Sequence, residues 1–190
     1  MNRHRINKQQ GFNLAELLIA MAILGIGLAI AIPGFGYLTK SNYLSTQASE
    51  IQTAMNYARN EAIRLNDNVL FCHSADGSLC SPPPSSGWQG WIIRAAGATI
   101  GAEQGPVLRQ GLIQTGYLQV SASGLPSPVT YAIRYNPQGL ARHFGTNTPL
   151  SGSINVCTTQ SGVALNLYSV RFSSGGRSEV EKINNSGVCP

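Results

Sequence analysis

The chain has 190 residues, of which 11% are charged, while glycine and proline together number 31. This length accommodates one ordinary domain with an appended segment and excludes two full-sized domains. Three of the 13 basic residues lie in the first ten positions, so ten basic residues face eight acids in the rest of the chain. Such a small, dispersed excess of positive charge does not predict that the chain binds nucleic acid or an anionic membrane through its overall charge.

The N-terminal region consists of a basic stretch followed by an apolar one. Residues 1–11 are polar and basic, and from Leu14 to Ile32 the only charged residue is Glu16. Nineteen residues of this kind match the thickness of a bilayer, and the basic residues before them predict a cytoplasmic N-terminus. We therefore expect one membrane-spanning helix within residues 12–36 and no later span.

Three processing schemes fit this pattern. An ordinary secretory signal would be cleaved after Ala29-Ile30-Ala31, and an uncleaved anchor would keep the whole segment. Neither scheme explains Glu16, because a carboxylate in an apolar helix costs roughly 2.5–3.5 kcal/mol at mid-membrane. The third scheme gives this carboxylate a role.

The third scheme rests on Gly11-Phe12-Asn13-Leu14-Ala15-Glu16-Leu17-Leu18-Ile19, which resembles the prepilin motif of type IV pilins and type II secretion pseudopilins. The resemblance implies that a prepilin peptidase cuts between Gly11 and Phe12, that Phe12 is then N-methylated, and that Glu16 is retained. Asn13 and Ala15 replace the Thr and Ile of many members, and neither change removes a group that cleavage needs. An ammonium on Phe12 of an incoming subunit would neutralise Glu16 and favour docking in one register.

The helix is expected to continue beyond the apolar stretch. Pro33-Gly34 ends that stretch and predicts a kink. Apolar residues then recur at spacings of three and four, which predicts an amphipathic helix to about residue 66. These residues are Leu44, Ala48, Ile51, Met55, Ala58, Ala62 and Leu65. The stripe is typical of a core face packed on a sheet, and a seam for a partner helix is the alternative.

After Asn66 the pattern changes to short β-like runs separated by Gly, Pro, Ser and Asn. We predict strands at 69–72, 90–94, 117–121, 129–135, 140–144, 154–158 and 163–172. Residues 95–116 are interpreted as a mobile excursion. The fold class is therefore α+β, with a long N-terminal helix packed on an antiparallel sheet in a globular head at residues 37–190.

Two further runs, Trp88-Gln89-Gly90-Trp91-Ile92-Ile93 and Tyr135-Asn136-Pro137-Gln138-Gly139, resemble the GspH/FimT subgroup of minor pilins and pseudopilins. These matches are less specific than the prepilin motif. A tryptophan on a strand is ordinary core, and Asn-Pro-x-Gly is an ordinary turn.

Four cysteines follow the apolar stretch, which predicts disulfides in an oxidising compartment. Loop length and the need to fasten a polar C-terminal tail favour the pairs Cys72–Cys80 and Cys157–Cys189, one of three connectivities. Metal binding is the weaker interpretation, since no pair has C-x-x-C spacing and His73 stands alone.

No chemistry-bearing pattern is found. The three histidines are His4, His73 and His143, and no nucleophile, zinc, phosphate-loop or dinucleotide motif occurs. The carboxylates of Asp67, Asp76, Glu103, Glu179 and Glu181 are scattered over turns and tail. We expect no enzymatic activity, no cofactor and no metal.

The favoured function is a minor pilin that helps to start or prime a type IV pilus. The resemblance implies an inner-membrane precursor with a periplasmic head, and as partners other pilins, a prepilin peptidase and an inner-membrane assembly platform. A type II secretion pseudopilin is the closest alternative, and two disulfides tilt the choice toward the pilus.

A DNA-binding pilin for natural transformation is a further alternative. Some members of the subgroup bind DNA through Gly-Arg-x-Arg, and here Gly176-Arg177-Ser178-Glu179 carries an acid in place of the second arginine. Arg171, Arg177 and Lys182 are the only candidate contacts near it. We expect at most weak DNA binding, because adjacent acids cancel the charge that drives it.

Overall fold

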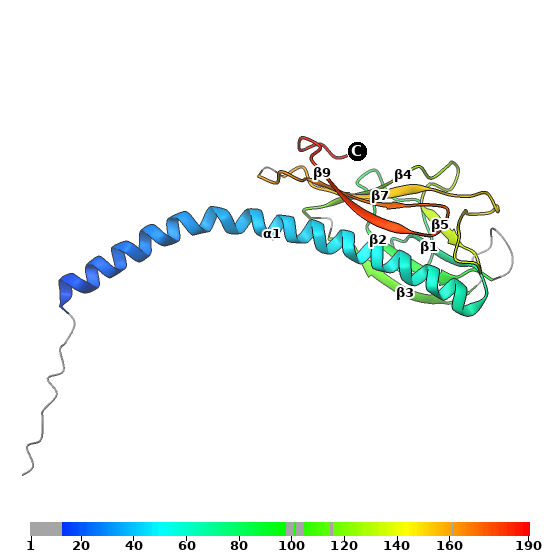
Figure 1. Ribbon diagram of the computed structural model, residues 1–190, viewed down its shortest axis with the longest axis horizontal. Helices are drawn as coiled ribbons and strands as arrows, with labels where there is room; N and C mark the ends of the chain where they lie inside the picture. Colours follow the sequence, from blue (N-terminus) through cyan, green and yellow to red (C-terminus); the bar gives the residue numbers. More distant parts are fainter. Residues whose placement is uncertain (1–12, 98–100, 102–104, 115, 161) are drawn as a thin grey trace, which may run out of the picture. The chain divides into compact units, whose positions relative to one another are not determined.

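The computed structural model describes residues 13–97, 101, 105–114, 116–160 and 162–190, apart from the side chains of residues 30–35 and 37. Within this range the chain forms one helix followed by nine strands (Figure 1). It divides into two compact units, one ending at Thr39 and the other comprising Lys40–Pro190. All of these strands belong to the second unit.

Helix α1 spans Leu14–Leu65, and Asn13 caps its start. The Asn13 side-chain oxygen accepts a hydrogen bond from Ala15 N–H at 3.4 Å, and its carbonyl oxygen accepts one from Glu16 N–H at 3.0 Å. Such a cap satisfies a donor that the first helical turn leaves unpaired. The helix continues through Pro33, and the kink expected there stays a prediction.

The end of α1 lies where the sequence predicted it. Asn66 has a φ of 51°, in the left-handed region that asparagine tolerates better than most residues. Asp67 N–H donates to Ala62 O, and Asn66 N–H donates to Ile63 O, both at 3.2 Å. These two bonds form a Schellman motif, which satisfies carbonyl groups of the last turn.

The second half of α1 buries the predicted apolar stripe. Six of the seven stripe residues have no exposed surface, namely Leu44, Ala48, Ile51, Met55, Ala58 and Ala62. The seventh, Leu65, is 38% exposed, so its assignment to the core was wrong. It is the last helical residue, where the chain turns away toward the first strand.

The first sheet has five antiparallel strands in the order β3-β2-β1-β5-β6. Their bounds are β1 Val69–His73, β2 Gly90–Ala95, β3 Val107–Leu112, β5 Ala132–Tyr135 and β6 Ala141–His143. The second sheet has four antiparallel strands in the order β4-β7-β8-β9. Their bounds are β4 Gln119–Ser123, β7 Gly152–Cys157, β8 Leu167–Phe172 and β9 Ser178–Ile183. The antiparallel pairing was predicted, but the division into two sheets was not.

Two strands were missed, and both lie at sheet edges. Strand β3 falls inside the segment 95–116 that was interpreted as a mobile excursion, and β9 lies after residue 172, where no strand was predicted. Both carry mostly exposed or half-buried side chains, so neither has the apolar run that reveals an inner strand. The strands predicted at 129–135 and 163–172 begin later than expected, at Ala132 and Leu167.

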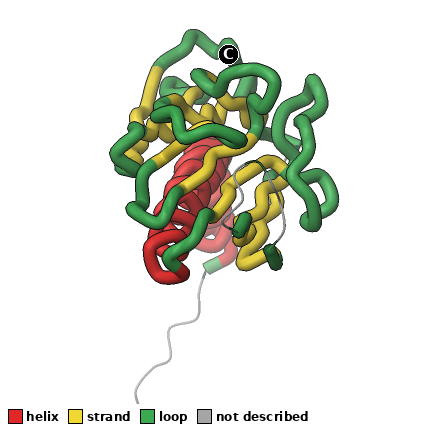
Figure 2. Tube along the Cα trace, turned by 90° about the vertical axis from the view of Figure 1, so that its right-hand side faces the viewer, coloured by secondary structure: helices red, strands yellow, loops and turns green. Residues whose placement is uncertain are grey.

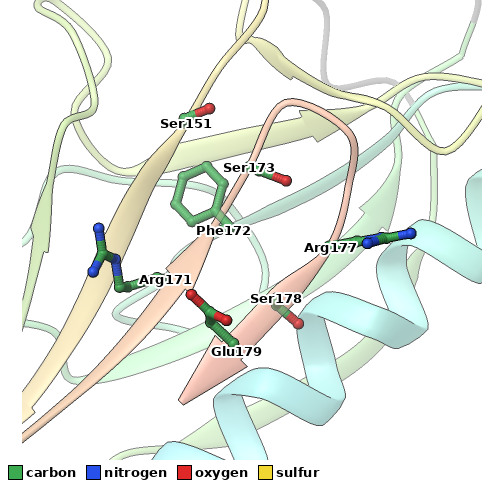
Figure 3. Close-up of a pocket in the computed structure, with 7 residues that line it drawn as sticks. All are labelled: Ser151, Arg171, Phe172, Ser173, Arg177, Ser178 and Glu179. Carbon is green, nitrogen blue, oxygen red and sulfur yellow. The ribbon is translucent and has the colours of Figure 1, made fainter. Parts of the chain in front are cut away.

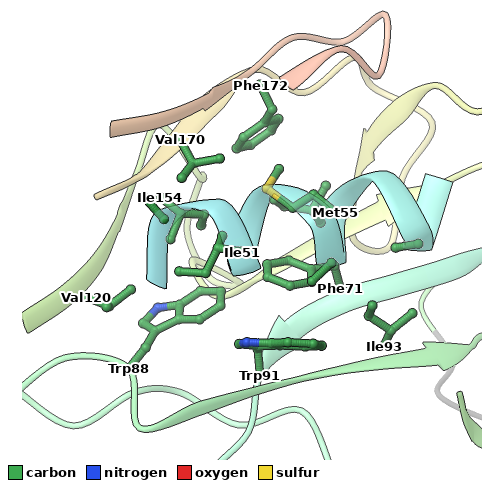
Figure 4. Packing of buried hydrophobic residues seen from close by; sticks show 14 of the residues in the cluster. Ile51, Met55, Phe71, Trp88, Trp91, Ile93, Val120, Ile154, Val170 and Phe172 are labelled. Carbon is green, nitrogen blue, oxygen red and sulfur yellow. The ribbon is translucent and has the colours of Figure 1, made fainter. Parts of the chain in front are cut away.

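The core of the second unit lies between α1 and the two sheets (Figure 4). Ile51 and Met55 of the helix lie among side chains of both sheets, including Phe71 of β1 and Val170 and Phe172 of β8. The Phe71 ring centre lies 5.9 Å from those of Trp88 and Trp91. A view from the end of the molecule shows strands on two sides of the helix (Figure 2).

The structure contains the two disulfides that the sequence predicted, Cys72–Cys80 and Cys157–Cys189. The second bridge holds the C-terminal segment, whose other attachments are polar. Asn166 Oδ1 accepts a hydrogen bond from Asn185 N–H at 2.8 Å, and Asn166 Nδ2 donates to Val188 O at 3.1 Å. The tail therefore depends on one covalent link and a few hydrogen bonds.

We predict that replacing Cys157 and Cys189 together by Ser lowers the free energy of unfolding by roughly 2–5 kcal/mol, as loss of a native disulfide does in small exported domains. Urea unfolding followed by tryptophan fluorescence measures this change. The Cys72→Ser/Cys80→Ser variant is the matched comparison. It should lose less stability, because the Cys72–Cys80 bridge joins residues 8 positions apart, whereas Cys157 and Cys189 are 32 positions apart. Unchanged stability without the Cys157–Cys189 bridge contradicts its fastening role.

Candidate functional site

The first group of predicted site residues lies at the start of the chain. Gly11 and Phe12 lie outside the described residues, as does the side chain of Pro33. Glu16 lies in the first turn of α1, and its side chain is exposed. A carboxylate there interacts favourably with the partial positive charge of the helix N-terminus. The Glu16 carboxylate thus does not destabilise the first turn of the helix, and a partner can reach it.

The residues around Glu16 present an apolar surface. Between positions 14 and 28, nine large apolar side chains are 50–76% exposed: Leu14, Leu17, Leu18, Ile19, Met21, Ile23, Leu24, Ile26 and Leu28. An exposed apolar surface of this extent is typical of a site covered by lipid or by another protein. Among the described residues, no helix combines the length and the apolarity needed to cross a membrane.

The second group of predicted site residues lies on the hairpin of β8 and β9. The connecting turn is closed by a hydrogen bond from Ser173 N–H to Arg177 O at 3.0 Å and another from Gly176 N–H to Ser173 O at 2.8 Å. Gly176 has a φ of +77°, a backbone conformation that residues with a Cβ rarely adopt. The chain therefore reverses direction in a tight turn at Gly175-Gly176.

Arg59 of α1 binds the neighbouring Asn136–Gly139 turn, which lies against the β8–β9 turn. Its Nε donates to Gly139 O at 3.0 Å, and a Cβ on Gly176 would lie only 2.1 Å from the same oxygen. Gly139 is less crowded, since a Cβ there would lie 2.7 Å from Ile63 Cδ1, the end of a side chain that can move, but its φ of +71° also favours glycine. The Asn136–Gly139 turn and the β8–β9 turn therefore meet at one point on α1, which the sequence did not reveal.

A depression of about 470 Å³ lies on this hairpin (Figure 3). It is lined by Ser151, Arg171, Phe172, Ser173, Arg177, Ser178 and Glu179. In Figure 3 the side chains of Arg171 and Arg177 point away from each other, and the Glu179 carboxylate lies between them. The two guanidinium groups therefore do not converge on one ligand position.

Strand pairing separates the remaining charges. Arg171 Nη1 lies 2.9 Å from Glu181 Oε2, and Arg171 also pairs across the strands with Glu179. Lys182 pairs with Tyr168, and its Nζ lies 5.2 Å from the centre of that ring. Successive strand residues face opposite sides of a sheet, so Lys182 lies on the face opposite to Glu179 and Glu181. The three predicted DNA contacts thus do not form a basic cluster.

Two buried polar residues outside the hairpin have structural partners. His73 has no exposed surface, and its Nδ1 lies 2.6 Å from Ser81 O. Arg134 is 2% exposed and donates to Asn68 Oδ1 and to Thr146 O. Burial lowers the pKa of the Arg134 guanidinium, and the nearby Arg142 charge acts in the same direction. Cys72 beside His73 is in a disulfide, which excludes the thiolate ligand that a metal site there would need.

Comparison with known proteins identifies the family. The model of the family described as type II transport protein GspH matches residues 47–177, which run from the second half of α1 to the end of the β8–β9 turn. The chain belongs to the GspH family. Residues 6–32 of this GspH-family protein also match the prokaryotic N-terminal methylation motif. The family consists of pilin-like and pseudopilin-like structural subunits, as the sequence predicted.

A solved structure supports the fold of this GspH-family protein. The type IV minor pilin FimU of Pseudomonas aeruginosa is similar with a TM-score of 0.52 and 18% identity, over 76% of this chain and 92% of FimU. A second crystal form of FimU gives a TM-score of 0.49 with 18% identity, over 72% and 91% of the two chains. At this identity the likeness establishes the fold. No curated protein matches the chain.

We predict that the head of this GspH-family protein, from about Tyr37 onward, binds duplex DNA weakly at physiological salt. A gel-shift titration over a range of salt concentrations measures the affinity, and Glu179→Arg, which restores Gly-Arg-x-Arg, is the matched gain-of-charge variant. Binding to phosphates should strengthen in that variant and weaken as salt rises. Tight, salt-sensitive binding by the unmodified head that is lost in Arg177→Ala would contradict the prediction.

Proposed function

We propose that this GspH-family chain is a minor pilin of a type IV pilus, and that it contributes to priming and assembly of the fibre. The observation that carries the proposal is the joint presence of the N-terminal methylation motif and the GspH head in one chain. The fold shared with a protein described as a type IV minor pilin agrees with this proposal, and the two disulfides tilt the choice toward the pilus. The chain acts by polymerising and by contacts of its head.

The N-terminal region anchors the precursor and then the subunit. Residues 1–11 form the leader, residues 12–36 the membrane and assembly helix, and residues 37–190 the head. A prepilin peptidase removes the leader between Gly11 and Phe12 on the cytoplasmic side, and Phe12 is N-methylated. The subunit stays in the inner membrane as a single-pass protein with a periplasmic head. An inner-membrane assembly platform then transfers it into the pilus.

Glu16 selects the register of assembly. The ammonium group of Phe12 on an incoming subunit pairs with this carboxylate, because an unpaired charge is costly in apolar surroundings. The exposed apolar side chains that surround Glu16 supply the rest of the contact with neighbouring helices. The exposed Glu16 carboxylate at the helix start supports this role, since a partner can reach it.

A type II secretion pseudopilin is the second candidate, favoured by the description of the matched family as a type II transport protein. Both candidates use the same leader, helix and head. Affinity purification of the chain from cross-linked membranes tests the choice. Recovery with pilus subunits supports the proposal, and recovery with secretion-system components alone replaces it with the second candidate.

We predict that the mature chain begins with Phe12 and carries one extra methyl group on its N-terminal nitrogen. Mass spectrometry of the N-terminal peptide from purified membranes measures both features. Gly11→Ala provides the control and should accumulate as the uncleaved precursor. A mature chain beginning at Ile32 would instead indicate an ordinary secretory signal, and the pilin assignment would then fail.

We predict that Glu16→Ala leaves membrane insertion and leader cleavage intact but strongly reduces incorporation into the fibre. The substitution removes the docking charge without making the helix less apolar. Fractionation of cells into membranes and sheared fibres, followed by immunoblotting, measures the distribution. Glu50→Ala, which removes a carboxylate elsewhere on α1, should be incorporated normally. Normal incorporation of Glu16→Ala would refute the pairing role.

A further inference from the structure

One end of the second unit exposes aromatic and aliphatic side chains. Tyr43 of α1 and Tyr117 of the β3–β4 connection stack with ring centres 6.1 Å apart, and they are 38% and 55% exposed. Leu165 is 41% exposed and Val188 60% exposed. We call the surface that carries Tyr43, Tyr117, Leu165 and Val188 the uncharged end.

Contacts between the loops bring these four residues to the same end. One depression of about 310 Å³ is lined by residues of four segments, including Tyr117, Gln160 and Cys189. Asn166, the neighbour of Leu165, donates to Val188 O at 3.1 Å. Leu165, Val188 and Tyr117 therefore lie on adjoining loops, and the ring stack adds Tyr43.

The composition of this end differs from that of the rest of the head. In the described residues of segments 40–44, 112–118, 158–166 and 184–190, the only charged side chain is Lys40. The other polar groups there are hydroxyls and amides. Asp76, a nearby carboxylate, lines a different depression with Leu112. The surface thus combines exposed apolar groups and neutral hydrogen-bonding groups with one cation.

The chain tethers this end to the segment proposed to lie in the membrane. Lys40 is the first residue of the second unit, and eight positions separate it from Ile32. Eight residues span at most roughly 28 Å even when fully extended. If the apolar stretch that ends at Ile32 lies in the bilayer, Lys40 and Tyr43 are held near the bilayer surface.

We propose that the uncharged end rests on the phospholipid headgroup region of the membrane while the subunit awaits assembly. This proposal rests on the membrane anchor of the proposed function. Tyrosine is enriched at this depth, because its ring prefers the apolar side and its hydroxyl the wet side. Hydroxyl and amide groups can exchange their contacts with water for contacts with lipid headgroups. Carboxylate side chains, which anionic lipids repel, do not occur among the described residues of this surface.

The membrane is the occupant that these observations favour over a neighbouring subunit. The surface is built from four separate segments that share a neutral composition, and it lies at the tethered end of the head. A protein partner would require complementary shape and charge, and this end offers a single cationic side chain. Contact with lipid would hold the head in one orientation before the fibre captures the helix.

Photocrosslinking of the full chain tests the proposal. Tyr117→p-benzoylphenylalanine places a lipid-reactive group at a site that is already aromatic and exposed, and Val188→p-benzoylphenylalanine is a second probe on another loop. Leu24→p-benzoylphenylalanine lies in the proposed anchor, and Leu65→p-benzoylphenylalanine is an exposed control at the C-terminal end of α1. Each variant is reconstituted in phosphatidylethanolamine and phosphatidylglycerol vesicles, irradiated, and analysed by mass spectrometry for lipid adducts.

The proposal predicts lipid adducts at Leu24, Tyr117 and Val188, several-fold more abundant than at Leu65. If lipid adducts form at Leu24 but are no more abundant at Tyr117 and Val188 than at Leu65, the proposed membrane anchor stands and the present proposal is overturned. Adducts from Tyr117 and Val188 only to a second protein chain would also overturn it and make this end a subunit interface. No lipid adduct at Leu24 would overturn the anchor of the proposed function and this proposal together.

Discussion

The close approach of the second half of α1 to two β-sheets is the constraint on which the rest of the head depends. The buried stripe contains Ala48, Ala58 and Ala62, and Ala54 is buried beside it. Small side chains let sheet residues reach the helix backbone, and larger ones would hold the layers apart. The two tryptophans, Phe71 and the inward side chains of β8 fill the space that remains.

The same packing determines where the hairpin charges lie. Arg59 donates a hydrogen bond to the Gly139 turn, and the β8–β9 turn packs so closely on Gly139 O that Gly176 has no room for a Cβ. With this end fixed, strand pairing sets Arg171 against Glu179 and places Lys182 on the helix-facing side of β9. The charge arrangement of the hairpin is thus a consequence of how the sheet docks on the helix.

The sequence was most informative where one physical signal dominates. The spacing of Leu44, Ile51 and Met55 predicted the buried face of α1, and the Asn66 turn marked its end. The disulfide pairing also followed from loop length, since both bridges join the partners that this argument favoured. Each of these features depends on residues close in the chain or on a simple period.

The missed features lack a strong signal of this kind. Strands β3 and β9 each pair on one side only, and neither contains a fully buried side chain, so neither has the apolar residues by which a strand is recognised. The division into two sheets depends on which strands meet, and short alternating runs do not encode that choice. The Gly139 and Gly176 turns also meet near Arg59, although both glycines lie 80 or more positions after it in the sequence.

This architecture separates two tasks within one helix. The first half exposes Leu14, Glu16 and the apolar residues after them, while the second half is the central element of a disulfide-bonded head. In the proposed function the first half carries polymerisation, and the head gives the subunit its identity.

Urea unfolding of the Lys40–Pro190 unit, followed by the fluorescence of the buried Trp88 and Trp91, tests this docking most directly. Ala58→Leu inserts a large side chain into the helix–sheet contact and should lower the free energy of unfolding by about 1–3 kcal/mol. Asn60→Leu, on the exposed face of the same helix, should change it by no more than about 0.5 kcal/mol. Equal stability of the two variants would contradict the account, because it would mean that α1 does not pack closely on the sheets.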